Sequence, residues 1–301
     1  MRVSQFQLIS LVQYLSVAVF WLSLSSLMAQ ETSFGGPVDQ GLIRLSRIKE
    51  ASGIAASQKN PGVLWIHNDS DPKNNIYAMD ANGKHLGRLR IGFRKPRDCE
   101  DIAVGPGPEK GKSYIYLGDI GDNKSRRPIK EIYRIPEPNV SHYHQVFDLT
   151  LKNISVITYR YPDGRRDAEA LMIDPQTSDI FIISKREDSV RVYMAPYPQS
   201  LDSDITLTYI GQLPVTMVTG GDISPSGDEV LIKNYFSVYY WKRQKDEIWK
   251  TAFQKQPEVL PYIPEPQGES ICWSRNGDGY YTTSEEKGNI PAKLYFYPRL
   301  K

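Results

Sequence analysis

The stretch DAEALMID, residues 167–174, places acidic residues directly ahead of a short apolar run. Four further segments share this acidic or small head before an apolar strand: EASGIAAS (50–57), DCEDIAVG (98–105), TGGDISPS (219–226) and QGESICWS (267–274). The third positions of the five heads, in chain order, are Ser52, Glu100, Glu169, Gly221 and Glu269, which lie 48, 69, 52 and 48 residues apart. A repeat of about fifty residues built from short strands is typical of a β-propeller.

Each head opens a unit of four predicted strands. In the third unit a second strand IFIISKRED (180–188), a third strand RVYMAPYP (191–198) with a recurring Tyr, and a fourth strand ITLTYIGQL (205–213) follow the head. The last unit lacks a fourth strand, because the chain stops at Lys301, whereas GLIRLSRI (41–48) belongs to no unit. If that segment completes the last blade, the ring closes without an open sheet edge. We predict an all-β, five-bladed propeller over residues 41–301. Six blades are the alternative if the long second repeat hides a blade around residues 141–147.

Composition limits the function classes. The chain has 301 residues, 40% hydrophobic and 24% charged, with a formal net charge of +2. These values suit a globular domain with a sizeable core. The small net charge gives no reason to expect a nucleic acid or a membrane surface as partner. Two cysteines are too few for a disulfide framework.

The N-terminus has the pattern of a secretory signal. A single Arg precedes an apolar stretch from about residue 8 to residue 24, and small residues end at Ala29. We interpret residues 1–29 as a cleaved signal peptide and residues 30–40 as a linker. An uncleaved anchor or a buried helix fits less well, because polar residues interrupt and follow the apolar stretch. A secreted or periplasmic monomer is expected, with no membrane contact after cleavage.

Three acidic heads predict a metal site. In a propeller, the loops that lead into the first strands lie on the same face as the loops between second and third strands, so Glu100, Glu169 and Glu269 should converge near the axis. Close carboxylates repel one another unless a cation offsets their charge. Ca²⁺ suits such a site because it accepts six to eight oxygen ligands in flexible geometry. The alternative is that these carboxylates only bind backbone N–H groups and hold the blades together.

The heads Ser52-Gly53, Glu100-Asp101, Glu169-Ala170, Gly221-Asp222 and Glu269-Ser270 resemble the calcium-activated nucleotidase (apyrase) family of secreted five-bladed propellers. In that family a Ser, Glu, Glu, Ser, Glu series holds a central Ca²⁺. The resemblance implies Ser52, Glu100, Glu169 and Glu269 as calcium ligands, with Gly221 departing from the series. The phrases SGIAAS…LWIHNDS and DCEDIAVGP also resemble bacterial secreted propellers of the SdiA-regulated and phytase-esterase-like groups, many of which lack an assigned activity.

Three functions follow from these patterns. The favoured one is a calcium-binding propeller that binds an anionic ligand or a protein partner, since basic residues such as Lys185, Arg186 and Lys233 flank the acidic centre. The second is a calcium-dependent phosphohydrolase. In it Asp101 or Glu285 would activate water, and Lys185 or Arg186 would offset the developing charge. The third is a structural or adhesive propeller without a ligand.

Overall fold

The computed structural model describes residues 33–45, 47–69, 75–92 and 96–301. The predicted signal peptide (1–29) and the first residues of the predicted linker (30–32) lie outside this part of the chain. Phe34–Lys301 forms one compact unit. None of the helices in the described ranges has the length and apolar character that a membrane crossing needs.

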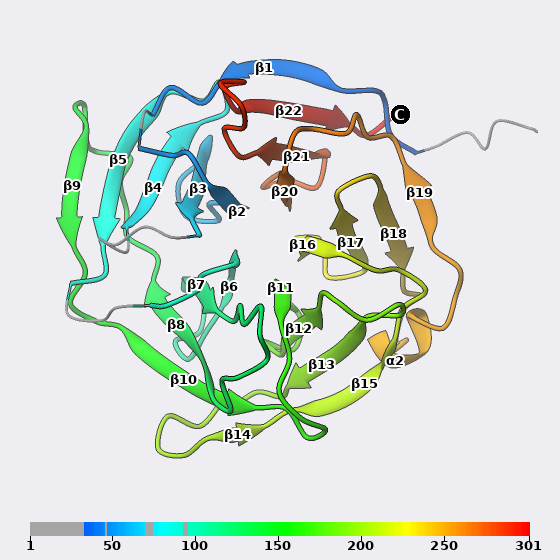
Figure 1. Cartoon of the computed structure of the whole chain (residues 1–301). Helices are drawn as coiled ribbons and strands as arrows, with labels where there is room; N and C mark the ends of the chain where they lie inside the picture. The colour runs from blue at the N-terminus through cyan, green and yellow to red at the C-terminus, as the bar shows by residue number, and fades with distance from the viewer. Residues whose placement is uncertain (1–32, 46, 70–74, 93–95) are drawn as a thin grey trace, which may run out of the picture. The chain divides into compact units, whose positions relative to one another are not determined.

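The described residues form five sheets arranged as blades around a common axis (Figure 1). Blade 1 contains β2 (Ala51–Ala56), β3 (Val63–Asn68), β4 (Asn75–Asp80), β5 (His85–Arg90) and β9 (Phe147–Thr150). Blade 2 contains β6 (Asp101–Pro106), β7 (Ser113–Asp119), β8 (Lys130–Pro136), β10 (Ser155–Arg160) and β14 (Ile205–Thr206). Blade 3 contains β11 (Ala168–Ile173), β12 (Ile180–Ser184), β13 (Arg191–Ala195) and β15 (Thr208–Gln212).

Blade 4 contains β16 (Val218–Ile223), β17 (Glu229–Asn234), β18 (Val238–Lys242) and β19 (Glu258–Leu260), with the short helix α2 (Trp249–Ala252) between β18 and β19. Blade 5 contains β20 (Gly268–Trp273), β21 (Gly279–Ser284), β22 (Lys293–Pro298) and β1 (Val38–Leu42). The predicted all-β five-bladed propeller is therefore confirmed. The strands β2, β6, β11, β16 and β20 are the innermost of their blades (Figure 1).

An N-terminal strand closes the ring, as predicted, but it is not the segment that the sequence indicated. The strand β1 pairs antiparallel with β22 and covers residues 38–42, so only Gly41 and Leu42 belong to the predicted segment 41–48. The apolar residues of that segment instead pack between blades 5 and 1, where Ile43, Leu45 and Ile48 join a cluster around Ile54. Their hydrophobicity serves the connection to blade 1 and does not mark an edge strand.

Residues 141–147 do not form a sixth blade, so that alternative is wrong. This part of the chain leads into β9, which adds to the outer edge of blade 1, parallel to β5. Phe147 begins β9 and lies against Gly87 on β5, where any Cβ atom would overlap its ring. The extra residues of the second repeat therefore form β9, a fifth strand at the outer edge of blade 1.

In three blades, the connection between the third and fourth strands contacts the preceding blade. In blade 2 this connection contains β9, which pairs with blade 1, and in blade 3 it contains β14, which pairs with β10 of blade 2. In blade 4 it contains α2, and the Trp249 indole Nε1 donates to Asp174 Oδ2 beyond the end of β11 at 3.0 Å. Neighbouring blades are thus linked by more than the chain that runs from one to the next.

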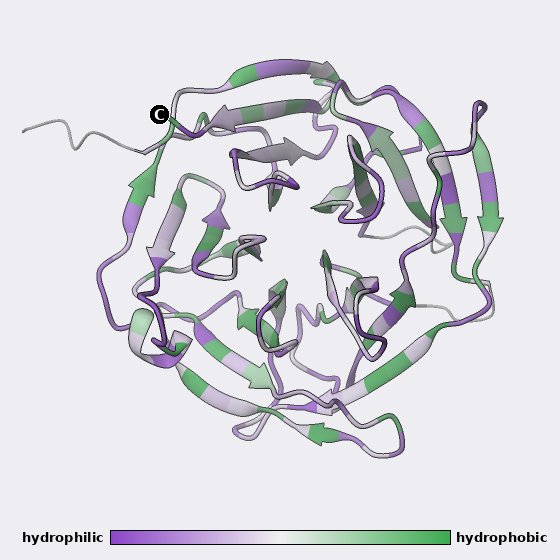
Figure 2. Cartoon of the chain, turned by 180° about the vertical axis from the view of Figure 1, so that it is seen from behind, coloured by the Kyte–Doolittle hydropathy of each residue, from purple (hydrophilic) through white to green (hydrophobic). Residues whose placement is uncertain are grey.

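The core consists of one apolar cluster at each seam between blades. Among the described residues, five clusters fill the seams 1–2, 2–3, 3–4, 4–5 and 5–1. Innermost strands such as β2 and β11 are buried at every position, because a neighbouring blade covers each face. Figure 2 shows hydrophobic and hydrophilic residues interspersed along the outer strands. This stack of seams holds the heads of the innermost strands near the axis.

Candidate metal centre

Every innermost strand begins with an irregularity that places two residues opposite one. In β2, β11, β16 and β20 the register shifts at Ser52, Glu169, Thr219 and Glu269. In blade 2, Glu100 donates its N–H to the Gly118 carbonyl at 3.1 Å, although Gly118 is already paired with Asp101. A β-bulge of this kind leaves one residue out of the ladder and re-aims its side chain. The five bulge residues form the first ring of the candidate site.

The bulges correct the sequence alignment of blade 4. The residue equivalent to Glu169 and Glu269 is Thr219, so the assignment of Gly221 to this position is wrong. Gly221 pairs with Ile232 inside the sheet, and a Cβ at this position would lie 3.2 Å from Met172 Sδ of blade 3. Thr219 is fully buried and directs its hydroxyl towards the Gly268 carbonyl, 3.5 Å away. The first ring therefore carries an oxygen-bearing side chain in all five blades.

The four residues predicted as calcium ligands come together in the structure. Ser52 Oγ lies 3.5 Å from Glu100 Oε2 and 3.4 Å from Glu269 Oε2, and all three residues are buried. Oxygen atoms of Glu100, Glu169 and Asp167 lie within 4.8 Å of one another. Their proximity agrees with the prediction, and their role as ligands stays a prediction.

A second ring lies beside the first and is made of residues that follow the second strand of each blade. Asp69, Gly121, Lys185 and Glu285 each donate a backbone N–H to the carbonyl of the residue two positions before a bulge, at 3.0–3.1 Å. Tyr235 follows β17 at the corresponding place in blade 4. The second ring carries a carboxyl group in blades 5 and 1 and no side chain in blade 2. It carries an ammonium group in blade 3 and a phenol group in blade 4.

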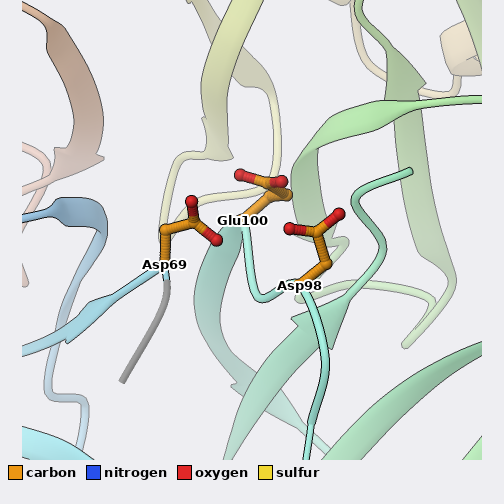
Figure 3. A group of neighbouring side chains, drawn as sticks. All are labelled: Asp69, Asp98 and Glu100. Atoms are coloured by element: carbon orange, nitrogen blue, oxygen red, sulfur yellow. The ribbon is translucent and has the colours of Figure 1, made fainter. Parts of the chain in front are cut away.

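Asp69, Asp98 and Glu100 form an acidic cluster where the two rings meet (Figure 3). Their carboxylate oxygens lie within 4.8 Å of one another. Asp69 Oδ1 is buried and has no hydrogen-bond partner among the described residues. Gly121 leaves the space that this cluster uses, because a Cβ at that position would overlap Glu100 Oε1 and lie 2.7 Å from Asp98 Oδ2. Sequence reasoning did not include Asp69 or Asp98 among the predicted calcium ligands, although Asp98 stands two positions before Glu100 as Asp167 stands before Glu169.

Burial and mutual repulsion raise the pKa values of these carboxyls. Burial raises the pKa of Glu100 well above its usual range, and the neighbouring Glu169, Asp69 and Asp98 add to the effect. The pKa of Asp69 rises to about 7, mainly through burial and then through Asp98 and Glu269. Burial also raises the pKa of Asp98. Such shifts show that negative charge is unfavourable here unless a cation is present.

The side chain of Lys185 places a positive charge beside the acidic centre. Lys185 Nζ forms an ion pair with Glu169 Oε1 at 2.8 Å and donates to the Tyr235 hydroxyl at 3.3 Å. Tyr235 in turn donates to Glu269 Oε1 at 2.9 Å. Burial raises the pKa of Glu169 to about 8 although Lys185 opposes the shift. The blade 3 and blade 4 side of the centre is therefore a closed hydrogen-bonded network.

The other basic residues near the centre are engaged as well. Arg186 Nε donates to Asp167 Oδ2 at 2.6 Å, and Arg186 Nη2 donates to Asn123 Oδ1. Lys233 is fully buried and donates to the backbone carbonyls of Gly268 and Asn234. These basic residues thus contact loops and carboxylates of the protein itself, and their role towards an anionic ligand stays a prediction.

The two predicted water-activating carboxylates occupy different environments. Asp101 is buried, and its oxygens accept the N–H groups of Ile102 at 2.8 Å and of Leu171, in the next blade, at 2.9 Å. The hydrogen bond from Leu171 makes Asp101 a link between blades 2 and 3. Glu285 is half-buried and accepts from Gln267 Nε2 at 2.9 Å, and burial together with Glu269 raises its pKa. Of the two, Glu285 is placed beside the acidic centre.

A cavity of about 400 Å³ lies at the opposite ends of the innermost strands. Its walls are mostly apolar and include Val104, Ile173 and Ile223, one from each of three blades. Lys59 and Lys112 are exposed residues of its lining. This cavity is separate from the acidic centre, because the residues of the two rings do not line it.

The sheets and the acidic axis define a five-bladed β-propeller with a carboxylate-rich centre. No model of a known protein family matches the sequence, and no curated protein matches it either. Solved structures that are similar in fold include the following two. One is a chain in the crystal structure of a nidogen/laminin complex, with 12% identity over 79% of this chain and 73% of that chain, and a TM-score of 0.47. The other is the Dos1 propeller, with 10% identity over 82% of this chain and 68% of that chain, and a TM-score of 0.38. Neither likeness bears on function, and the specific resemblance to apyrases or phytase-like propellers is not confirmed.

Proposed function

We propose that the protein is a secreted or periplasmic propeller that binds Ca²⁺ at its axis and a protein partner on the surrounding loop face. The observation that carries this proposal is the cluster of Asp69, Asp98 and Glu100, whose three carboxylates gather within 4.8 Å. Hard oxygen donors dominate the centre, since Ser52 and Thr219 supply hydroxyls beside the carboxylates. Such a set suits Ca²⁺ and not zinc or copper, which favour imidazole and thiolate ligands.

Asp69, Asp98 and Glu100 would hold the ion, because Glu169 is already paired with Lys185. Two further observations support the fit. Asp69 Oδ1 is buried without a hydrogen-bond partner in the described ranges. Gly121 keeps the space beside Glu100 and Asp98 free of a side chain. A bound dication would offset the repulsion among these carboxylates and fix the loops of blades 1 and 2.

A protein partner suits the rim better than a free anion does. Met217, Phe236 and Ile290 are exposed hydrophobic residues in loops on this face. Met217 is tied to the centre, since its N–H donates to the Lys185 carbonyl at 2.9 Å. Lys185 and Arg186, which sequence reasoning offered to an anion, are engaged by Glu169 and Asp167. An anionic ligand would therefore depend on the metal for its positive contact.

A calcium-dependent phosphohydrolase is supported less well. Asp101 has no place in it as a base, because both of its oxygens accept backbone N–H groups within the blade seam. Glu285 remains, and burial shifts its pKa upward, in the direction that strengthens a carboxylate as a proton acceptor. Release of phosphate from nucleotides, phytate and simple esters, with and without Ca²⁺, would distinguish this function from binding alone.

Calcium is expected to raise the melting temperature of the protein. At a free concentration one hundred times its dissociation constant, an ion that binds only the folded state raises stability by about 2.7 kcal/mol. For a domain of this size that corresponds to a shift of about 5–10 °C. The measurement is thermal unfolding of chelator-treated protein across a Ca²⁺ series, with Mg²⁺ as the comparison ion.

Glu100→Gln should lose most of this shift, because it removes the carboxylate shared by the acidic cluster and the first ring. Glu109→Gln is the matched control, since Glu109 is exposed and pairs only with Lys112 and Tyr114 among the described residues. Its melting temperature should respond to Ca²⁺ as the wild type does. Absence of any wild-type shift at millimolar Ca²⁺ would contradict the proposal and leave the carboxylates a structural role.

A further inference from the structure

Lys185 is a charged side chain almost sealed within the acidic centre. It follows β12, and its side chain is 8% exposed. Its Nζ contacts Glu169 Oε1 at 2.8 Å and lies 5.5 Å from the centre of the Tyr235 ring. An ammonium held this closely by a carboxylate occupies the position that a metal ion would need in order to reach Glu169.

The two sides of the centre differ in what fills them. On the side of blades 1 and 2, the second ring provides Asp69 and Gly121. Neither Asp69 nor Glu100 forms an ion pair with a basic side chain in the part of the chain that the structure describes. On the side of blades 3 and 4, Lys185 and Tyr235 take up Glu169 Oε1 and Glu269 Oε1. The first ring itself carries a Glu on both sides. The difference between the sides therefore comes from the second ring.

We infer that Lys185 is a tethered counter-cation that takes the place of a metal ion on the blade 3 and blade 4 side of the centre. It confines divalent-cation binding to Asp69, Asp98 and Glu100. This inference rests on the proposed function, because it concerns how the same centre selects and limits its ion. Without the ammonium, Glu169 becomes available as a further carboxylate ligand, and repulsion between the two cations disappears.

Lys185→Met tests the inference, because methionine keeps much of the side-chain length and removes the charge. The variant is expected to bind Ca²⁺ about tenfold more tightly or better, since relief of cation–cation repulsion and one added carboxylate act in the same direction. Calcium is titrated calorimetrically into the chelator-treated chain. Terbium luminescence sensitised by the nearby Tyr235 supplies a second readout of the same site.

Matched variants separate the charge from other effects. Lys242→Met makes the same change at an exposed lysine on β18 and should bind Ca²⁺ as the wild type does. Lys185→Arg keeps the charge and should also behave as the wild type. Glu169→Gln combined with Lys185→Met should lose the gain, because the ligand that the ammonium had covered is then neutral. If Lys185→Met is unstable without metal, Lys185→Gln retains a hydrogen bond to Glu169 and serves in its place.

The outcomes for the two proposals are distinct. Wild-type binding with no gain in Lys185→Met overturns the counter-cation and leaves the proposed calcium site standing. Binding by Lys185→Met but not by the wild type overturns the proposed calcium function and supports the inference, with Lys185 replacing the metal entirely. Failure of both proteins to bind overturns both. Tighter binding by Lys185→Met that survives Glu169→Gln also overturns the inference.

Discussion

Replacement of Phe34 by alanine is expected to lower the free energy of unfolding by about 3–5 kcal/mol, the usual cost of truncating a buried aromatic side chain. Phe34 is 1% exposed. Its ring lies 5.4–6.0 Å from the rings of Tyr240, Trp273 and Tyr280, and the Arg299 guanidinium is stacked 4.6 Å from its centre. Phe34 also pairs with Arg299 just ahead of the strand that closes the ring. The loss therefore combines a cavity with a weaker closure.

Urea-induced unfolding of Phe34→Ala measures this effect. The matched control is Phe236→Ala, the same substitution at a side chain that is 74% exposed. Its cost should stay within about 0.5 kcal/mol, as is usual for surface positions. Similar small losses in both variants would show that the N-terminal segment does not contribute to the folded ring.

In the absence of divalent cations, the protein is expected to become less stable by several kcal/mol as the pH rises from about 5 to about 8. Burial raises the pKa of Glu169 to about 8 and that of Asp69 to about 7, and it raises that of Glu100 well above its usual range. Unfolded Glu and Asp titrate near pH 4. Between the two ranges the folded state binds more protons than the unfolded state. The protonated carboxyls therefore leave the folded state at its full stability below about pH 4. That stability is lost as the pH rises through the pKa values of the folded state.

Unfolding free energies at pH 5, 6.5 and 8, in chelator and in millimolar Ca²⁺, test this prediction. Calcium should reduce the loss at high pH, because it binds the ionised carboxylates. Glu100→Gln should flatten the profile in chelator, since it removes one titrating group and lowers the repulsion on its neighbours. Carboxyls whose pKa is lowered by Arg partners, such as Asp148, titrate below this window. A metal-free protein that gains stability between pH 5 and pH 8 would contradict the expected electrostatics.

The repeated heads sufficed to predict the blades, because each head precedes the innermost strand of one blade. The same pattern could not locate the bulges, since a bulge depends on how a strand pairs with its neighbour. Thr219 and Gly221 both stand in the head TGGD, and only the pairing of β16 with β17 shows which one leaves the ladder. The convergence of Ser52, Glu100, Glu169 and Glu269 was predictable from their equivalent positions.

The partners of the charged residues could not be predicted. Lys185 and Arg186 are neighbours in the sequence, yet one pairs with Glu169 and the other with Asp167. Asp101 follows Glu100 directly, and the alternation of side chains turns it into the blade seam, where Leu171 supplies its donor. These assignments depend on the faces of neighbouring blades, which are brought together only when the ring closes.

The backward connections of blades 2, 3 and 4 make the blades interdependent during unfolding. Each of β9, β14 and α2 covers part of the preceding blade, so a blade cannot open without uncovering apolar surface on its neighbour. Stacked repeats that meet only at simple interfaces can unfold in steps from their ends. Here the overlaps and the closure by β1 remove free ends. The ring should consequently unfold in one cooperative transition, and local fluctuations should concentrate in its loops rather than travel from blade to blade.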